Sequence, residues 1–251
     1  MNILLTGSEG FIGKHLHKHL ENNNHKVIPI DKLSGNDLIN CNLKYDVGLV
    51  IHLAGLSGVR DSLDRPTEYW KENVIAGQRL FDYFPNTKIL YASSSTAIEP
   101  WRNPYAMSKY SLEQIAPENS IGMRFTTVYG PGAREHMLIP RILRNDVPFV
   151  HTNHTRDFIH VDDIISAIDT LMKSEFTGVT DIGIGKSYNL LEMITYFGID
   201  FKEKRVGNEF EREDNTADTE VLNKLNWSVK TDLYNYIKEN KNVNWNNEKR
   251  T

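Results

Sequence analysis

Tyr105 and Lys109 are the residues whose types and spacing most directly suggest chemistry. They stand four positions apart, so on a helix they lie on one face, one turn from each other. An unperturbed phenol has a pKa of about 10 and is a poor base at neutral pH. A neighbouring ammonium favours the phenolate and is expected to lower the pKa of Tyr105. The pair predicts proton transfer with a substrate hydroxyl, although the same spacing also occurs in solvated Tyr and Lys pairs.

A run of hydroxyl residues precedes this pair. Ser93, Ser94, Ser95 and Thr96 follow an apolar segment at residues 88–92 that has the length and composition of a buried strand. The carboxyl ends of parallel strands form the ligand-binding edge of open α/β sheets. Hydroxyl groups at that edge can orient a substrate alcohol.

A glycine-rich segment near the N-terminus has the context of a phosphate-binding loop. Gly7, Gly10 and Gly13 follow a strand-like run at residues 3–5 and open an amphipathic helix over residues 11–20. Glycines let the backbone approach a pyrophosphate, whose charge then meets free N–H groups and the positive end of the helix dipole. The spacing is GxxGxxG and not the commoner GxGxxG, so alone it is equally compatible with a plain strand-to-helix turn.

Asp31 strengthens the case for a dinucleotide. It closes a second strand-like run at residues 27–30, at the offset of roughly 20 residues where a carboxylate can bind the adenosine ribose. A carboxylate there repels a 2′-phosphate and favours NAD over NADP, whereas the adjacent Lys32 weakens that preference. The alternative is an aspartate that merely ends a strand. Pro29 within this run predicts an edge strand, because proline lacks the N–H that a central strand needs.

Composition and charge exclude several classes of function. The 251 residues are 39% hydrophobic and 25% charged, and their net charge of −4 leaves no basic excess for a nucleic acid or an anionic membrane. No apolar run approaches the ~18 residues of a membrane span. The first apolar run is too short for a signal peptide, and Cys41 is the only cysteine, so we expect a cytoplasmic protein.

The histidines do not suggest a metal site. No pair of them stands at helical spacing with a carboxylate partner. We interpret His52 as a strand residue and the others as loop or packing residues, and we expect no metal ligands. The histidines considered are His52, His151, His154 and His160.

Apolar runs alternate with amphipathic stretches along the first two thirds of the chain. Further strand-like runs lie at residues 49–53, 89–92 and 121–125, and amphipathic helices begin near Val161 and Leu190. This βαβ rhythm predicts a parallel sheet with helices on both faces. A polar tail at residues 239–251 is expected to fray.

Taken together, the motifs resemble the extended short-chain dehydrogenase/reductase family, specifically its NAD-dependent nucleotide-sugar epimerases and dehydratases. The resemblance runs nearly from end to end. The matching segments are residues 6–13, 50–55, 58–66, 73–77, 105–109, 124–131 and 156–163. It implies a doubly wound Rossmann fold of the α/β class with a small C-terminal substrate-binding lobe. We expect residues 1–130 to form the NAD-binding domain, a strand and helix near residues 151–175 to return to it, and residues 131–251 to form mainly the substrate lobe.

The resemblance also implies roles for individual residues. Ser94 becomes the catalytic hydroxyl, with Ser95 as the alternative, Tyr105 the proton acceptor, and Lys109 the residue that holds the nicotinamide ribose. The cofactor-binding residues expected are Gly7, Gly10, Phe11, Ile12, Gly13, Asp31, Lys32, Leu53, Ala54, Gly55, Asn73, Tyr105, Lys109 and Thr126. The substrate-binding residues expected are Ser95, Thr127, Arg134, Arg156 and Arg212, with Arg205 as an alternative to Arg212 for the second arginine of the nucleotide diphosphate.

Family membership leaves several reactions open. Dehydratases of the family carry Asp-Glu after the catalytic hydroxyl, where this chain has Ser95-Thr96, and so they rank low. The serine run resembles the 4-epimerases, and the segments 58–63 and 126–134 resemble those acting on UDP-glucuronate or UDP-glucose. There Thr127 and Arg134 match residues near a sugar carboxylate. A keto-sugar reductase of the same fold and a dinucleotide-binding regulator without turnover are the alternatives.

The chain is shorter than its family around the expected site. Only residues 97–104 separate the serine run from Tyr105, where family members carry a loop of fifteen or more residues. This shortening predicts either a more open pocket or a chain that has lost turnover. The family dimerises through helices near residues 65–84 and 105–116, so a homodimer is expected, and the shortened second helix opposes it.

Overall fold

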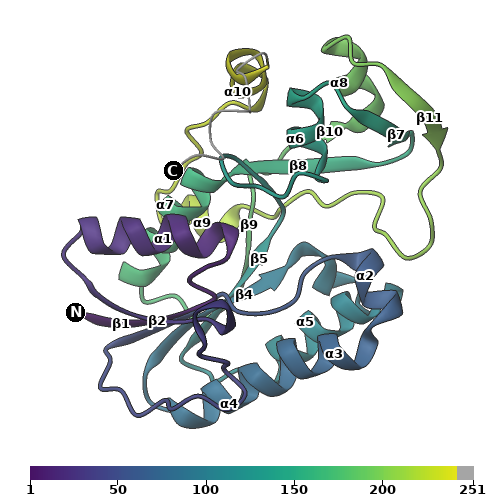
Figure 1. The fold of residues 1–251 in the computed structure, drawn as a ribbon. Helices are drawn as coiled ribbons and strands as arrows, with labels where there is room; N and C mark the ends of the chain where they lie inside the picture. Colours follow the sequence, from purple (N-terminus) through teal and green to yellow (C-terminus); the bar gives the residue numbers. More distant parts are fainter. Residues whose placement is uncertain (242–251) are drawn as a thin grey trace.

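Six short segments form one parallel sheet in the computed structural model, which describes residues 1–241 (Figure 1). The strand order is β2-β1-β3-β4-β5-β9, and every neighbouring pair is parallel. The strands are β1 (Asn2–Thr6), β2 (Lys26–Ile30), β3 (Leu49–His52), β4 (Lys88–Ser94), β5 (Ser120–Phe125) and β9 (Gly178–Ile182). The α/β doubly wound fold expected from the sequence is confirmed.

Helices cover both faces of this sheet. Along β1, Ile3 and Leu5 pack on the side of α1 (Phe11–Asn22) and α7 (Val161–Lys173), whereas Leu4 packs on the side of α4 (Ala76–Tyr83) and α5 (Pro104–Ile115) (Figure 1). Successive side chains of a strand point to opposite faces, so a continuous apolar run is buried twice. α2 (Val59–Asp64) and α3 (Pro66–Trp70) precede α4, to which the π-helical turn η2 (Lys71–Ile75) connects them.

Pro29 lies where its chemistry requires. It belongs to β2, which pairs only with β1 and forms the edge of the six-stranded sheet. An edge strand needs ladder hydrogen bonds on one side only, so the missing N–H is tolerated. The prediction of an edge strand is confirmed.

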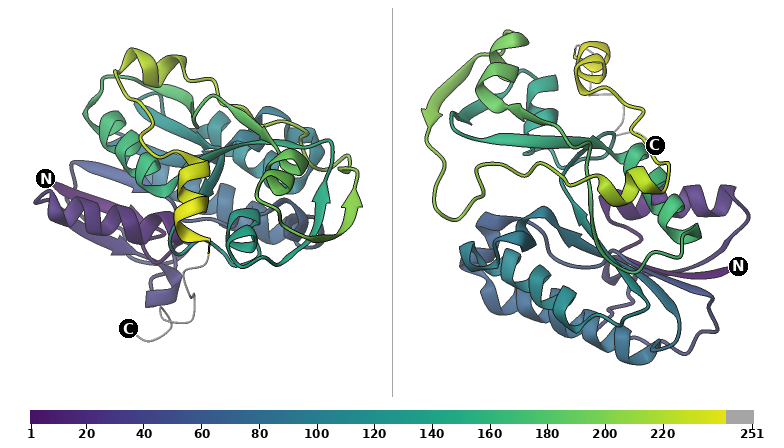
Figure 2. Two further views of the ribbon diagram at one scale, coloured as in Figure 1. Left: turned by 90° about the horizontal axis from the view of Figure 1, so that it is seen from above. Right: turned by 180° about the vertical axis from the view of Figure 1, so that it is seen from behind.

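A smaller lobe lies beyond the carboxyl ends of the strands (Figure 2). It contains a three-stranded sheet ordered β10-β8-β6 and a two-stranded sheet of β11 and β7. A second apolar core, which includes Tyr129, Phe158 and Met193, joins these sheets to the helices. The elements are β6 (Thr127–Tyr129), α6 (Leu138–Leu143), β7 (Val147–His151), β8 (Thr155–His160), β10 (Ser187–Asn189), α8 (Leu190–Tyr196), β11 (Phe201–Arg205) and α10 (Leu233–Asn240).

The chain passes between the lobes more often than a boundary at residue 130 implies. α7 returns to the large sheet, but the strand before it, β8, pairs with β6 and β10 in the small lobe. The sixth strand of the large sheet is instead β9, against which α9 (Glu220–Lys224) packs. β8 and β9 are both short and partly buried, and they differ in their pairing partners.

The expectations about membrane spans and the C-terminal tail concern the helices of the chain. None of the helices formed by residues 1–241 is long and apolar enough to cross a bilayer. Of the polar tail expected at residues 239–251, Glu239 and Asn240 belong to α10, and residues 242–251 lie outside the part that the structure describes.

Candidate active site

Ser94 and Tyr105 meet at the carboxyl end of β4. Asn103 caps α5, since its Oδ1 accepts from Ala106 N at 2.8 Å, and Pro104 occupies the first helical turn, which places Tyr105 at the helix start. The Tyr105 hydroxyl is hydrogen-bonded to Ser94. Ser95 lies beside a different partner, because its Oγ is 3.5 Å from the Asn215 amide. The geometry therefore favours Ser94 as the hydroxyl that acts with the phenol.

The hydrogen-bond partner of Lys109 is a backbone carbonyl. Its Nζ donates to the carbonyl of Ala92 at 3.0 Å, and burial lowers its pKa to about 8. Burial raises the pKa of Tyr105, and the groups that oppose this rise are the Ser94 hydroxyl and the Arg134 guanidinium. Burial of the ring has the largest effect on the pKa of Tyr105 in the protein alone, and the lowering expected from Lys109 together with the nicotinamide stays a prediction.

A buried ion pair lies one turn beyond Lys109. Glu113 receives two hydrogen bonds from Arg124, at 2.8 and 2.6 Å, and another from the Ser93 hydroxyl. Its negative charge raises the pKa of Lys109 against the effect of burial. Glu113 was not among the predicted site residues, although the spacing 105, 109, 113 places it on the same helical face as Tyr105 and Lys109.

Asn73 fastens the loop after β3 to α5. Its Oδ1 accepts from Leu56 N at 2.7 Å, and its Nδ2 donates to Leu56 O and to the Ser108 hydroxyl at 2.9 Å. A Cβ on Gly55 would come within 2.7 Å of Asn73 Oδ1 and 3.4 Å of Lys109 Nζ. The fully buried amide therefore lies behind the predicted catalytic lysine.

The glycine loop is a cradle that side chains would fill. A Cβ on Gly13 would lie 2.0 Å from the carbonyl oxygen of Gly7, and Gly7 itself has a φ of +72° and contacts the backbone of Ala54. Gly10 provides no side-chain cap to α1, so no side chain of the N-cap residue satisfies the first N–H groups of this helix. Asp31 accepts from Glu9 N at 3.0 Å. These features fit a dinucleotide pyrophosphate at the helix N-terminus.

Thr6 and His52 position the next wall of this cradle. Thr6 Oγ1 lies 2.7 Å from His52 Nδ1 and accepts from Ala54 N at 3.2 Å. Burial, reinforced by the charge of Lys109, lowers the pKa of His52 to about 3, so the ring is neutral. Leu53, Ala54 and Gly55, all predicted cofactor contacts, thus follow directly from the end of β3.

The predicted substrate residues come from both lobes and from the segment between them. Asn215 connects Thr127, to whose hydroxyl it donates at 3.1 Å, with Ser95. Arg134 donates to the hydroxyl and carbonyl of Ser57, and its charge acts on Tyr105. Thr126, predicted at the cofactor, is buried and hydrogen-bonded to Asp157 and Ile182. Both hydrogen-bond partners of the Thr126 hydroxyl are therefore groups of the protein itself.

The arginines divide into two groups. Arg156 donates to the carbonyls of Thr155 and Glu213, and Arg212 donates to the carbonyl of Ser95 at 2.6 Å; their charges interact. Arg205 instead pairs with Glu203 on the exposed side of β11. The geometry therefore favours Arg212 over Arg205 as the partner of Arg156.

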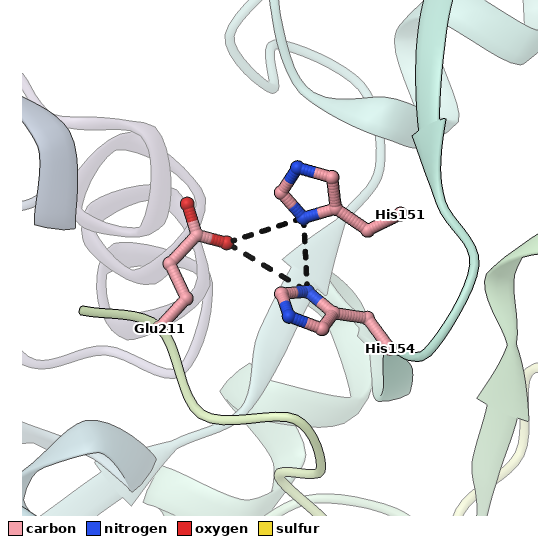
Figure 3. A group of neighbouring side chains, drawn as sticks. All are labelled: His151, His154 and Glu211. Carbon is pink, nitrogen blue, oxygen red and sulfur yellow. Dashed lines mark hydrogen bonds and ion pairs between the residues drawn. The ribbon is translucent and has the colours of Figure 1, made fainter. Parts of the chain in front are cut away.

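His151 and His154 form a cluster with Glu211 (Figure 3). The two Nδ1 atoms are 3.1 Å apart, and each lies 3.7 Å from Glu211 Oε2. The histidine spacing gave no sign of this cluster because its carboxylate comes from a distant segment. Arg60 of α2 also contacts Glu211, through a 3.1 Å hydrogen bond that the sequence analysis did not anticipate.

The chain is similar to known proteins in both sequence and structure. Residues 3–190 match the sequence model described as the NAD dependent epimerase/dehydratase family. The Protein CapI of Staphylococcus aureus is 31% identical, over 69% of this chain and 70% of its own. The UDP-glucose 4-epimerase of Pisum sativum is 26% identical, over 95% and 96%. Among solved structures, MoeE5 in complex with UDP-glucuronic acid and NAD has a TM-score of 0.83 at 26% identity, covering 95% of this chain and 97% of that one.

Proposed function

Because the chain belongs to the NAD dependent epimerase/dehydratase family, we propose that it is an enzyme that epimerises a UDP-sugar at C4 through a transient 4-keto sugar. Its cofactor is NAD. The observation that carries the proposal is the meeting of Ser94, Tyr105 and Lys109 at the carboxyl edge of the sheet, opposite the glycine cradle. The UDP-sugar 4-epimerases among its relatives support the choice of reaction.

The cofactor residues have distinct tasks. The first-turn N–H groups of α1, with Gly7, Gly10 and Gly13, hold the pyrophosphate, and Asp31 holds the adenosine ribose while it braces the loop at Glu9. The predicted neighbours Phe11, Ile12, Lys32, Asn73 and Thr126 complete or support this surface. When bound, NAD supplies a reversible acceptor for the hydride of C4, so no second substrate is consumed.

Side chains of the protein transfer the proton in the proposed reaction. Ser94 orients the 4-hydroxyl, and Tyr105 accepts its proton and later returns it. Lys109, which lies one turn away on α5, binds the nicotinamide ribose and supplies positive charge to the site. The raised pKa of Tyr105 implies that bound cofactor and substrate complete the activation of the phenol.

The residues after Ser94 separate this proposal from dehydration. Elimination of water needs a carboxyl acid and base beside the sugar, and Ser95-Thr96 supplies only hydroxyls. The Thr96 hydroxyl donates to Ser94 at 2.9 Å, which fixes Ser94. We therefore rank epimerisation above dehydration.

The substrate side is proposed to bind the diphosphate through Arg156 and Arg212 and the sugar through Ser95, Thr127 and Arg134. A planar guanidinium suits bidentate contact with phosphate. Arg134 is exposed and close to Tyr105, so it can meet a group at the far end of the sugar. A carboxylate there would make the substrate a UDP-uronate.

We also propose a homodimer and a cytoplasmic location. Exposed apolar side chains gather on the family's dimer helices, at Trp70, Ile75 and Tyr83 and, on α5, at Met107 and Tyr110. Such a surface is typical of a subunit contact. Light scattering on the purified protein measures the mass directly, and a single-chain mass would contradict the dimer.

Product analysis tests the proposed reaction. Purified protein is incubated with NAD and each of UDP-glucose, UDP-glucuronate, UDP-N-acetylglucosamine and their GDP and dTDP counterparts. C4 epimers without net NADH formation are expected from at least one UDP-sugar. Net NADH oxidation on a keto sugar would indicate a reductase, and unchanged sugars throughout would contradict an enzyme.

The Arg134→Met variant then tests the sugar. If Arg134 meets a uronate carboxylate, the variant should raise KM for UDP-glucuronate by about 10- to 100-fold, the effect expected for a hydrogen bond to a charged group. KM for UDP-glucose should change little. An equal change for both sugars would remove the argument for a uronate.

A further inference from the structure

Residues 206–219 form an irregular strap that connects β11 to α9 and runs between the two lobes (Figures 1 and 2). Both lobes hold it. On the cofactor side, Asn103 donates to the carbonyl of Phe210 at 2.8 Å. On the substrate side, Thr155 N donates to the carbonyl of Glu213 at 2.8 Å. The side chains between these anchors are therefore held between the two lobes.

Glu211 turns its carboxylate into a cluster of basic groups (Figure 3). Oε1 accepts from Arg60 Nε at 3.1 Å, and Oε2 lies 3.7 Å from Arg156 Nη2 and from the Nδ1 atoms of His151 and His154. The side chain is 15% exposed. Since Arg60 belongs to the cofactor lobe and Arg156 to the substrate lobe, this carboxylate connects the two.

The charge balance of the cluster suits an anion. Burial and then the charge of Arg156 lower the pKa of His154 to about 4, and burial also lowers that of His151, so both rings are neutral. Arg60 and Arg156 then outweigh Glu211 in formal charge. Two histidines and a glutamate at these distances resemble ligands of a divalent cation. However, Arg156 Nη2 already donates to His154 Nδ1 at 2.9 Å, and a cation would meet two guanidinium groups.

Most contacts of the Glu211 carboxylate are longer than hydrogen bonds. Its contact with Arg60 is a hydrogen bond, whereas its 3.7 Å contacts exceed hydrogen-bond length and act through charge. Arg156, in turn, uses Nη1 on two backbone carbonyls and keeps Nη2 at the cluster. A stronger anion can therefore take the place of Glu211 while the backbone contacts of Arg156 remain.

We propose that Glu211 is an internal counter-ion that occupies the anion subsite of Arg156 and leaves it when the diphosphate of the nucleotide sugar binds. The inference rests on the proposed function, which assigns Arg156 to that diphosphate. While Glu211 is seated, the strap bonds to Arg60; when Glu211 leaves, Arg60 loses this hydrogen bond but keeps its place over the Phe149 ring of β7. Glu211 thus competes with the substrate for the same positive charge and lowers substrate affinity.

The test is the affinity for UDP of the full chain saturated with NAD, measured by isothermal titration calorimetry. Glu211→Gln keeps the size of the side chain and an acceptor for Arg60 but removes the charge. We expect the variant to bind UDP about 1.5- to fivefold more tightly than the unmodified protein, the range given by an ion pair of about 0.2–1 kcal/mol. NAD affinity, measured in the same way, should be unchanged and shows that the variant is folded.

Glu213→Gln is the matched control. It removes the same charge from the same strap, but the Glu213 carboxylate is bonded to Asn153 and does not enter the cluster. Its UDP affinity should equal that of the unmodified protein, so a gain shared by both variants would indicate net charge alone and overturn the proposal.

Three other results would contradict the proposed exchange. Equal or weaker UDP binding by Glu211→Gln would show that the carboxylate does not compete, and the proposed function would stand. If neither protein binds UDP while both bind NAD, the nucleotide-sugar function fails and the exchange fails with it. Zinc binding to the unmodified protein that is lost in Glu211→Gln would identify a cation site and overturn the exchange.

Discussion

The predicted cofactor side and the predicted substrate side of the site are built in different ways. On the cofactor side, Gly7, Ser94 and His52 stand at the ends of parallel strands whose register fixes them. On the substrate side, Arg156 and Glu211 meet because an irregular strap crosses between lobes. The first arrangement depends on backbone geometry, and the second depends on a balance of side-chain charges.

This difference predicts how each side responds to change. A backbone cradle should fail when one atom is added, because the sheet around it does not yield. A charge cluster should adjust by a modest factor, because exposed or partly exposed ion pairs contribute little each. Loss of the chemical step should leave both kinds of binding intact.

The largest effect is expected from Tyr105→Phe. Removal of the hydroxyl deletes the proposed proton acceptor and should lower kcat by about 10²- to 10⁴-fold. NAD and UDP affinities, measured by calorimetry, should remain close to those of the unmodified protein. Tyr110→Phe, which changes an exposed tyrosine on the same helix, is the control. A turnover rate near normal in Tyr105→Phe would remove the assigned role.

Gly13→Ala should have the next largest effect, on the cofactor side alone. The added Cβ would lie 2.0 Å from Gly7 O, so the loop must shift away from the pyrophosphate. Overpacking of this kind costs about 1–3 kcal/mol, which corresponds to a roughly 5- to 150-fold rise in the Kd for NAD. UDP affinity should be preserved.

Gly48→Ala serves as the control for Gly13→Ala. A Cβ at Gly48 would meet its nearest neighbour only at 3.9 Å. Its NAD affinity is expected to match that of the unmodified protein. Equal NAD binding by Gly13→Ala and Gly48→Ala would mean that the loop is not the pyrophosphate site.

Glu113→Gln should produce the smallest effect, a change in pH dependence. The charge of Lys109, whose pKa is about 8, is present below that pH and is lost as pH rises through it. Glu113 raises this pKa, so its neutralisation lowers it, and less than about half of Lys109 remains charged at pH 8. The falling alkaline limb of the kcat profile should therefore move to lower pH.

Exposed Glu118 supplies the comparison for that experiment, since Glu118→Gln removes a charge just beyond the same helix. Its pH profile should follow that of the unmodified protein. Thermal melting of both variants reports the cost of disturbing the buried pair with Arg124. An unshifted alkaline limb in folded Glu113→Gln would mean that the carboxylate does not act on Lys109.

Much of the cofactor side could be predicted from the sequence because its requirements are local. Pro29 indicated an edge strand, and the spacing of Tyr105 and Lys109 placed them on one helical face. The spacing did not indicate that burial raises the pKa of Tyr105 or that the Lys109 ammonium donates to a backbone carbonyl. Spacing fixes which residues are neighbours, but desolvation depends on everything packed around them.

The substrate side was harder to predict. Arg156 was expected at the diphosphate, but its contact with Glu211 joins two segments between which α7, β9, β10, α8 and β11 lie. Arg212 and Arg205 were equivalent in the sequence, and only the path of the chain turned one toward Ser95 and the other toward Glu203. No short-range pattern records such a path.

The sequence by itself determined that the glycine loop, Asp31, the serine run and the Tyr105 and Lys109 pair stand beside the strands of one parallel sheet, and it predicted a dinucleotide at the carboxyl edge of that sheet. These features follow from backbone conformation and residue period, which act over a few positions. The resemblance had already named Ser94 ahead of Ser95, whereas the tertiary structure alone decided that Glu113 lies one turn beyond Lys109 and that Glu211 lies among the basic groups. Contact and charge act through space, and only the folded chain sets those distances.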